Sequence, residues 1–225
     1  SHLPPLPECS PVLLSSLDGR SGNILVWGDG WSSQPHIQDS TSTRRPVQVP
    51  DASHFDTPQL DLSFSGRKML TVCGGYGTMA LITDAGDMIY SGKDPLPEHQ
   101  VAVDVGGVRY VASGYKHSLL LTEAGVLYST GSNTYGQLGH TGDGHEDTAR
   151  PVVAVSDRKV GAVACGKHHS MCLVEGGDVY CWGCGSDGQT GTGRMETVMV
   201  PRFVKGLHGM EAVRIACGSN FSMCV

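Results

Sequence analysis

Two stretches of the sequence hold residues of the types found in metal and redox sites. Cys181-Trp-Gly-Cys184 has the two-residue gap of zinc ligand pairs and of thiol–disulfide motifs. A second cluster gathers four potential ligands: Cys165, His168, His169 and Cys172. Zinc sites normally need a second ligand pair, and redox motifs of this kind stand at the start of a helix. Neighbouring strand residues face opposite ways, so His168 and His169 cannot both face one ion. We expect no metal and no cofactor here, and a His169 satisfied by backbone hydrogen bonds within its own blade.

Other polar stretches do not assemble a catalytic set either. Gly183-Cys-Gly-Ser-Asp-Gly188 is rich in glycine but lacks a following helix, whose N-terminus would hold a phosphate. Asp143, His145, Glu146 and Asp147 have the composition of a solvated loop. No nucleophile, base and orienting group stand in a recognisable order. We therefore expect a protein that is not an enzyme.

The elements that carry these residues are predicted to be strands. The chain of 225 residues contains 31 Gly and 12 Pro, which leaves little room for long helices. Residues 118–128 have the pattern of a strand, a tight turn and a second strand, and the pattern recurs at 79–90 and 171–182. The sequence predicts an all-β fold.

One motif occurs four times. It contains a Gly, two variable residues and, in two copies, a His-Ser pair. Its glycines are Gly74, Gly114, Gly166 and Gly218, so that the periods are 40, 52 and 52 residues. Such periods, together with the strand pattern, are typical of β-propeller blades.

These residues resemble the regulator of chromosome condensation repeat family. That repeat combines the Gly-x-x-His-Ser element with a Gly-x-Val-Tyr-x-Trp-Gly hairpin and an Asn-x-x-Gly-Gln-Leu-Gly tail, matched here at 114–139 and 166–191 and in part at 74–92. The resemblance implies four-stranded blades, usually seven in full-length relatives. After Gly92 the tail is degraded to Lys93-Asp-Pro-Leu-Pro-Glu98. The variable pair is Trp-Arg in the plant UV-B photoreceptor branch of the family, and because no Trp occupies it here we do not expect photoreception.

We expect one repeat domain of about four repeats. Residues 69–110, 111–162 and 163–214 form the repeats, 215–225 begin a further one, 9–28 form a degenerate hairpin, and 29–68 form a long excursion. In an alternative arrangement, residues 23–28 pair with 221–225 and close a ring. We favour an arc of a larger propeller, completed by further sequence or another chain, over a closed ring of four blades. Pro151 and Pro201 are expected to open edge strands.

The cysteine positions suggest where in the cell the protein occurs, and the net charge argues against one class of partner. Several of the eight cysteines share one repeat position with Ser, Leu or Ala, which favours buried free thiols and a cytoplasmic or nuclear protein. The formal net charge of −6 argues against a broad nucleic-acid surface. No apolar run reaches the roughly 18 residues of a membrane span.

The variable pairs after each repeat glycine are the candidate binding residues. They should gather at one rim of the propeller and bind a protein partner, although solvated turn residues are the alternative interpretation. The candidates are Tyr76, Tyr115, Lys116, Lys167, His168, Ser219 and Asn220. We expect a non-catalytic protein-interaction module. The alternative is guanine nucleotide exchange on a Ran-like small GTPase, and a chromatin-associated partner is a third possibility.

Overall fold

The computed structural model describes residues 24–29, 54–61, 69–75, 78–83, 88–92, 105, 107–142 and 144–225. Their regular structure consists of strands and two short 3-10 turns, η2 (Val153–Val155) and η3 (Lys205–Leu207), as the all-β prediction requires. The strands of the two complete sheets are β6 (Val108–Ser113), β7 (His117–Thr122), β8 (Leu127–Gly131), β9 (Glu146–Pro151), β10 (Val160–Cys165), β11 (His169–Val174), β12 (Val179–Gly183) and β13 (Val198–Phe203). The other strands are β1 (Ile24–Asp29), β2 (His54–Asp61), β3 (Met69–Gly74), β4 (Thr78–Thr83), β5 (Met88–Gly92), β14 (Ile215–Cys217) and β15 (Ser222–Cys224).

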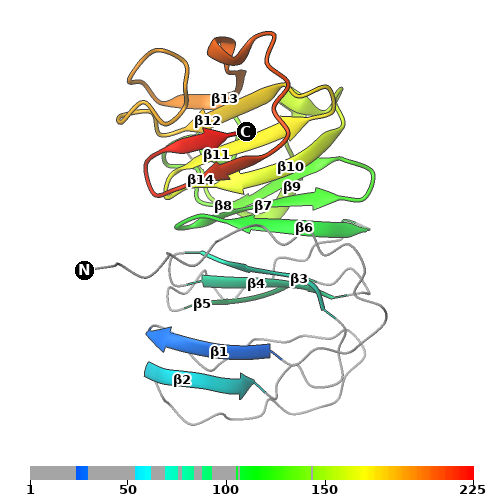
Figure 1. Ribbon diagram of the computed structural model, residues 1–225, viewed down its shortest axis with the longest axis vertical. Coiled ribbons are helices and arrows are strands. Elements are labelled where there is room, and N and C mark those ends of the chain that lie inside the picture. Colours follow the sequence, from blue (N-terminus) through cyan, green and yellow to red (C-terminus); the bar gives the residue numbers. More distant parts are fainter. Residues whose placement is uncertain are drawn as a thin grey trace, which may run out of the picture.

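The strands form five separate antiparallel sheets that follow the sequence. β6–β9 and β10–β13 are complete four-stranded blades, β3–β5 form three strands of another, and β1–β2 and β14–β15 form two-stranded sheets. Along the longest axis of the structure, β1–β2, β3–β5 and β6–β9 follow one another, and β14–β15 lies beside β10 and β11 in the last part (Figure 1). This arrangement confirms the prediction of propeller-type blades.

Each blade repeats the same pairing register. The first and second strands shift register near their outer end, as between Val108 and Tyr110 in β6 and between Val160 and Ala162 in β10. The third and fourth strands shift near a glycine, as between Ser129 and Gly131 in β8. Such bulges increase the local twist of a sheet. Gly131 has a φ of +104°, a conformation that other residues adopt only with strain, and a Cβ there would meet the backbone of Lys116.

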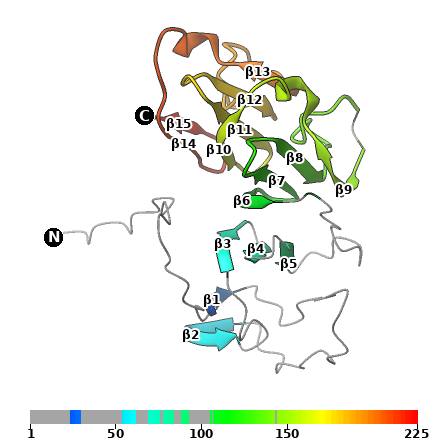
Figure 2. The same cartoon turned by 90° about the vertical axis from the view of Figure 1, so that its right-hand side faces the viewer.

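The hydrophobic core lies between the sheets. Three joints between sheets share one arrangement: β6 packs on β3 and β4, β10 packs on β6 and β7, and β14 packs on β10 and β11 (Figure 2). The joint between the two complete blades buries Leu119, Val163, Cys172 and Trp182 together. Because these three joints bury apolar side chains, the sheets on either side of each joint stabilise one another.

The N-terminal strands differ from the sequence-based expectation. β1 pairs with β2, which lies inside the segment 29–68 that was expected to be an excursion. The expected hairpin 9–28 falls largely outside the described residues, and the alternative pairing of 23–28 with 221–225 does not occur in this structure.

The two prolines were also misplaced by sequence reasoning. Pro151 ends β9 and Pro201 lies inside β13, so neither begins its strand. Both strands are the fourth and outermost of their sheets, where a missing backbone N–H is tolerated. Within the residues that the structure describes, no helix is long and apolar enough to cross a membrane.

Candidate partner-binding rim

The loop between the first and second strand of each blade carries the variable pair. A backbone hydrogen bond joins each loop to the next: the Tyr115 N–H donates to the Lys167 carbonyl at 3.1 Å, and the Lys167 N–H donates to the Ser219 carbonyl at 2.9 Å. Each bond spans one repeat of 52 residues. The pairs at 115–116, 167–168 and 219–220 therefore form one continuous row at one end of the blades.

Aromatic and cationic groups cluster in the first part of this row. The amines of Lys116 and Lys167 lie 5.3 Å and 5.8 Å from the centre of the Tyr115 ring. The His168 ring meets Tyr115 edge-on at 5.4 Å between centroids and Tyr135 at 4.7 Å. These distances lie within the range of cation–π and aromatic contacts. We call Tyr115, Lys116, Tyr135, Lys167 and His168 the rim cluster.

The rim cluster is cationic because of its lysines. Partial burial lowers the pKa of His168 below its ordinary 6.5, and the charge of Lys167 lowers it further, so this imidazole is neutral at pH 7. Lys167 is exposed, and Tyr135 has 41% of its surface exposed. The cluster can offer two positive charges beside aromatic rings to a partner.

A buried histidine follows each of the first two pairs in the sequence and bonds to a serine of the next blade. The Nε2 of His117 lies 3.0 Å from the Ser170 Oγ, and the Nε2 of His169 lies 3.0 Å from the Ser222 Oγ. Each serine hydroxyl already donates to a carbonyl, so each imidazole must be the Nε2–H donor to the serine. The repeat glycine leaves room for the ring, since a Cβ at Gly166 would collide with the His169 ring.

The hydrogen bond of His169 corrects one prediction from the sequence, and the environments of His168 and His169 agree with another. His169 bonds to a serine side chain of the next blade, and not to backbone within its own blade. His168 and His169 do face different environments, since His168 is half-buried and His169 is fully buried, as strand geometry requires. Among the residues described here, no three His, Cys, Asp or Glu side chains are placed to hold a metal ion.

The described cysteines are all free thiols: Cys73, Cys165, Cys172, Cys181, Cys184, Cys217 and Cys224. Cys181 is buried on β12 and its Sγ contacts the Gln189 carbonyl at 3.5 Å, whereas Cys184 contacts the Ser186 hydroxyl at 3.4 Å. The two thiols of this motif therefore have separate hydrogen-bond partners. Cys9 falls outside the described residues.

The structure places six of the seven candidate residues in the row, and Tyr76 lies outside the described residues. Their role in binding a partner stays a prediction. Sequence reasoning missed Tyr135, which belongs to the tail loop of the preceding blade and reaches the row only through the packing of the blades. The one sequence signal for Tyr135 was its aromatic side chain, because the equivalent residue of the next repeat is Asp187.

Comparison with known families explains the repeat. Two models described as "Regulator of chromosome condensation (RCC1) repeat" match the chain, one at residues 124–173 and 176–225 and the other at 108–137 and 162–189. The matched segments cover the two complete blades and the β14–β15 sheet.

Individual relatives are much longer than this chain. It is 28% identical over 218 residues to the human E3 ubiquitin-protein ligase HERC2, which covers 90% of the chain and 4% of HERC2. It is 40% identical over 192 residues to the human probable E3 ubiquitin-protein ligase HERC3, covering 82% of the chain and 18% of that relative. The structure of Prp20p from Saccharomyces cerevisiae aligns with a TM-score of 0.68 and 20% identity over 90% of this chain and 51% of Prp20p. This last similarity concerns the fold.

Proposed function

Because the chain belongs to the regulator of chromosome condensation (RCC1) repeat family, we propose that it is a non-catalytic protein-interaction module that binds a protein partner at its rim. The row of Tyr115–Lys116, Lys167–His168 and Ser219–Asn220 is the binding surface, with Tyr135 as an added contact. Tyr76 belongs to the same repeat position and is proposed to extend the row. The module requires no cofactor.

The rim cluster is the observation that supports this function. Tyrosine is enriched in protein interfaces, and the rings of Tyr115 and Tyr135 both contact the His168 ring. The cations on the Tyr115 ring suit a partner with acidic residues, because such a partner gains both charge and aromatic contact. The backbone bonds between loops hold these side chains on a rigid base.

Partner capture from a lysate, with mass spectrometry, tests the proposal. The double variant Tyr115→Ala/Lys116→Ala should weaken binding of a captured protein at least about tenfold, since truncation of an interface anchor costs about 2 kcal/mol or more. The melting temperature should change little.

A matched control removes the same kind of pair elsewhere. Arg158 lies 5.5 Å from the Tyr180 ring centre, and Tyr180 is near the opposite end of β12 from the rim. Tyr180→Ala/Arg158→Ala should leave binding unchanged. Normal binding by the rim variant, or equal losses in both variants, would contradict the proposal.

Nucleotide exchange on a Ran-like small GTPase is the second candidate function. Prp20p has a similar fold, and its binding to Gsp1p and histones has been described. Release of a fluorescent guanine nucleotide from such a GTPase, with and without this chain, distinguishes exchange from simple binding. A histone pull-down tests the chromatin-associated alternative. A cytoplasmic or nuclear location is proposed with these partners.

A further inference from the structure

Successive blades carry different residues at one position of the row. The second residue of the variable pair is Lys116 in one blade, His168 in the next and Asn220 after that. Each stands two positions after its repeat glycine, in the loop between a first and a second strand. A lysine keeps its charge at physiological pH, whereas an imidazole changes its charge near pH 6.5. Among these three blades, the charge at this position therefore depends on pH in one.

Two tyrosine rings contact the His168 ring. Tyr115 comes from the loop between β6 and β7 and meets it edge-on at 5.4 Å between centroids, and Tyr135 comes from the tail loop of the same blade and lies at 4.7 Å. The Cys184 N–H donates to the His168 carbonyl at 2.8 Å. The ring is half-buried, so part of it remains accessible to a partner at the rim.

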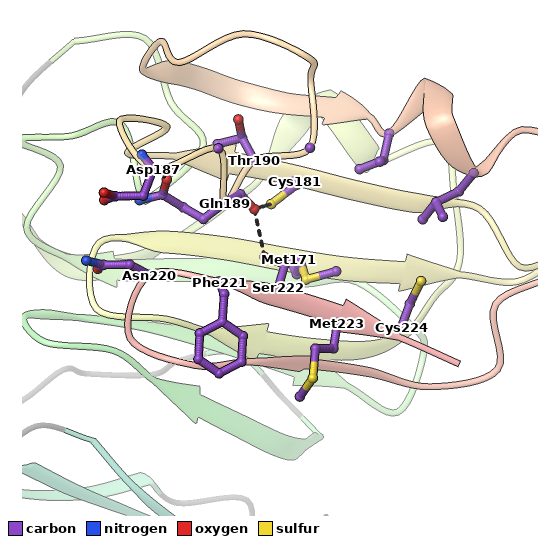
Figure 3. A pocket seen from close by; sticks show the side chains of 14 residues that line it. Met171, Cys181, Asp187, Gln189, Thr190, Asn220, Phe221, Ser222, Met223 and Cys224 are labelled. Atoms are coloured by element: carbon purple, nitrogen blue, oxygen red, sulfur yellow. Dashed lines mark hydrogen bonds between the residues drawn. The ribbon is translucent and has the colours of Figure 1, made fainter.

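The next joint lacks these groups. Asn220 stands in place of His168 and Asp187 in place of Tyr135. Figure 3 shows Asp187 and Asn220 at the same end of this joint. Neither an amide nor a carboxylate gains a positive charge in mildly acidic solution. The combination of an imidazole with two tyrosines thus belongs to the joint between the two complete blades.

The groups that surround His168 are cationic or neutral at pH 7. The titratable residues that pack against it or lie close to it are Lys167, His169, Tyr115, Lys116, Tyr135, His117 and Cys184. Tyrosine and cysteine side chains are ordinarily neutral at this pH. None of the ion pairs among the described residues includes His168. A protonated His168 would therefore add a third positive charge to the two lysines of the rim cluster.

In the free protein two effects keep this imidazole neutral. Partial burial lowers the pKa of His168, and the charge of Lys167 lowers it further. The Nδ1 of His168 is also buried and has no hydrogen-bond partner, so a proton there would be left unpaired. The neutral ring therefore carries its hydrogen on Nε2, which is a donor for an acceptor on the partner.

A carboxylate of a bound partner reverses this preference. An opposite charge within about 4–6 Å raises the pKa of an imidazole by about one to three units. Between the pKa values of the free protein and of the complex, the complex then binds more protons than the separate molecules. By linkage, affinity rises as the pH falls through this range. Lysines keep their charge throughout, so they strengthen binding without making it depend on pH.

We propose that His168 makes the rim a pH-dependent binding site for an acidic segment of a protein partner, because the imidazole takes up a proton when a carboxylate of the partner docks beside it. The assignment rests on the proposed binding at the rim and adds its regulation. Burial holds the pKa of His117 at about 3 and that of His169 at about 4, so neither responds in mildly acidic solution. The affinity of the rim therefore depends on one group.

Binding of a fluorescent peptide of eight aspartates tests the proposal in the intact chain. Aspartate has an ordinary pKa of about 3.9, so the peptide stays ionised between pH 7.5 and pH 6.0. Anisotropy titrations should give an affinity at least about threefold higher at pH 6.0 than at pH 7.5. Circular dichroism at both pH values checks that the chain is folded. Equal affinities, or no binding at either pH, would overturn the proposal.

Two variants assign the effect to His168. His168→Gln keeps a donor but cannot gain a charge, so its affinity should be the same at both pH values. His168→Lys places here the residue that the preceding blade has as Lys116. It should bind the peptide at pH 7.5 at least about threefold more tightly than the parent chain, with no dependence on pH. A glutamine variant that keeps the pH dependence of the parent chain would contradict the proposal.

His208→Gln is the matched control. His208 is exposed, and its ring contacts Phe203, which pairs with Tyr180 near the opposite end of β12 from the rim. This variant should keep the pH dependence of the parent chain. If it lost that dependence as His168→Gln does, the rim imidazole would not be the responsible group.

Proton NMR of the His168 ring measures the proton uptake directly. Its pKa should lie below 6.5 in the free protein and should rise when the aspartate peptide is added. An unchanged pKa would exclude proton uptake. Tyr115→Ala/Lys116→Ala distinguishes this failure from failure of the proposed function. If that double variant weakens peptide binding at pH 7.5 but binding by the parent chain does not depend on pH, the rim binds without the switch. If the double variant binds normally, the rim is not the site and both proposals fail.

Discussion

The imidazole of His117 is joined to the hydroxyl of Ser170 across the joint between two blades, at 3.0 Å between Nε2 and Oγ. The same bond recurs one repeat later between His169 and Ser222. Both imidazoles are buried, and neither Nδ1 has a hydrogen-bond partner. A neutral imidazole fits this environment, whereas a second proton would place an unpaired charge in it.

Stability should fall as the solution becomes mildly acidic. Burial lowers the pKa of His117 to about 3 and that of His169 to about 4, from an ordinary 6.5. In the unfolded chain both groups take up protons as the pH falls through 6.5, while the folded chain does not. The free energy of unfolding should therefore decrease below pH 6.5, by about 1.4 kcal/mol per pH unit for each histidine.

Urea unfolding curves between pH 7 and pH 5 measure this effect. His117→Gln keeps a side-chain donor and should reduce the change in the free energy of unfolding by about 1.4 kcal/mol per pH unit, because one titrating group is gone. If the free energy of unfolding of the parent chain did not change between pH 7 and pH 5, the two imidazoles would not titrate as buried groups.

Gly166→Ala should destabilise the protein by about 2 kcal/mol or more. The new methyl group would collide with the His169 ring and would lie 2.7 Å from the Gly218 carbonyl oxygen. Gly206→Ala is the matched control, because no atom lies within 4 Å of a Cβ there. Thermal unfolding compares the two variants, and equal melting temperatures would contradict the steric argument.

Trp182→Phe should cost about 1–2 kcal/mol of stability, because the Gln137 carbonyl loses one of its two donors while the ring position stays filled. Trp182→Ala should cost about 3–5 kcal/mol, since the indole is fully buried and its removal leaves a cavity. Denaturant unfolding of both variants measures the difference. A phenylalanine variant as stable as the parent chain would show that the indole N–H contributes little.

The eight cysteines should all be free thiols, as their repeat positions predict. Burial raises the pKa of Cys181 and of Cys217 to about 12, so both remain protonated and should react slowly with iodoacetamide in the folded protein at neutral pH. Mass spectrometry after unfolding under non-reducing conditions should count eight alkylated residues. A disulfide, or zinc in stoichiometric amount, would contradict this prediction.

The sequence by itself determined the blade and its repetition. Glycine spacing and alternating apolar residues act locally, so they located the hairpins 118–128 and 171–182 and placed Tyr115, Lys167 and Ser219 at equivalent positions. Local patterns also separated His168 from His169. They did not reveal β2, because its sequence, His-Phe-Asp-Thr-Pro-Gln-Leu-Asp, has a proline and weak alternation and becomes a strand through pairing with β1.

The contacts between blades were decided by the tertiary structure alone. His117 bonds to Ser170, Trp182 bonds to Gln137, and the ring of Tyr135 contacts that of His168, and in each pair the partners belong to different blades. Repeat spacing cannot predict such pairs, because it fixes which residues are equivalent and not how far one sheet is rotated over the next. That rotation depends on how the apolar faces pack, so only the assembled fold brings these side chains together.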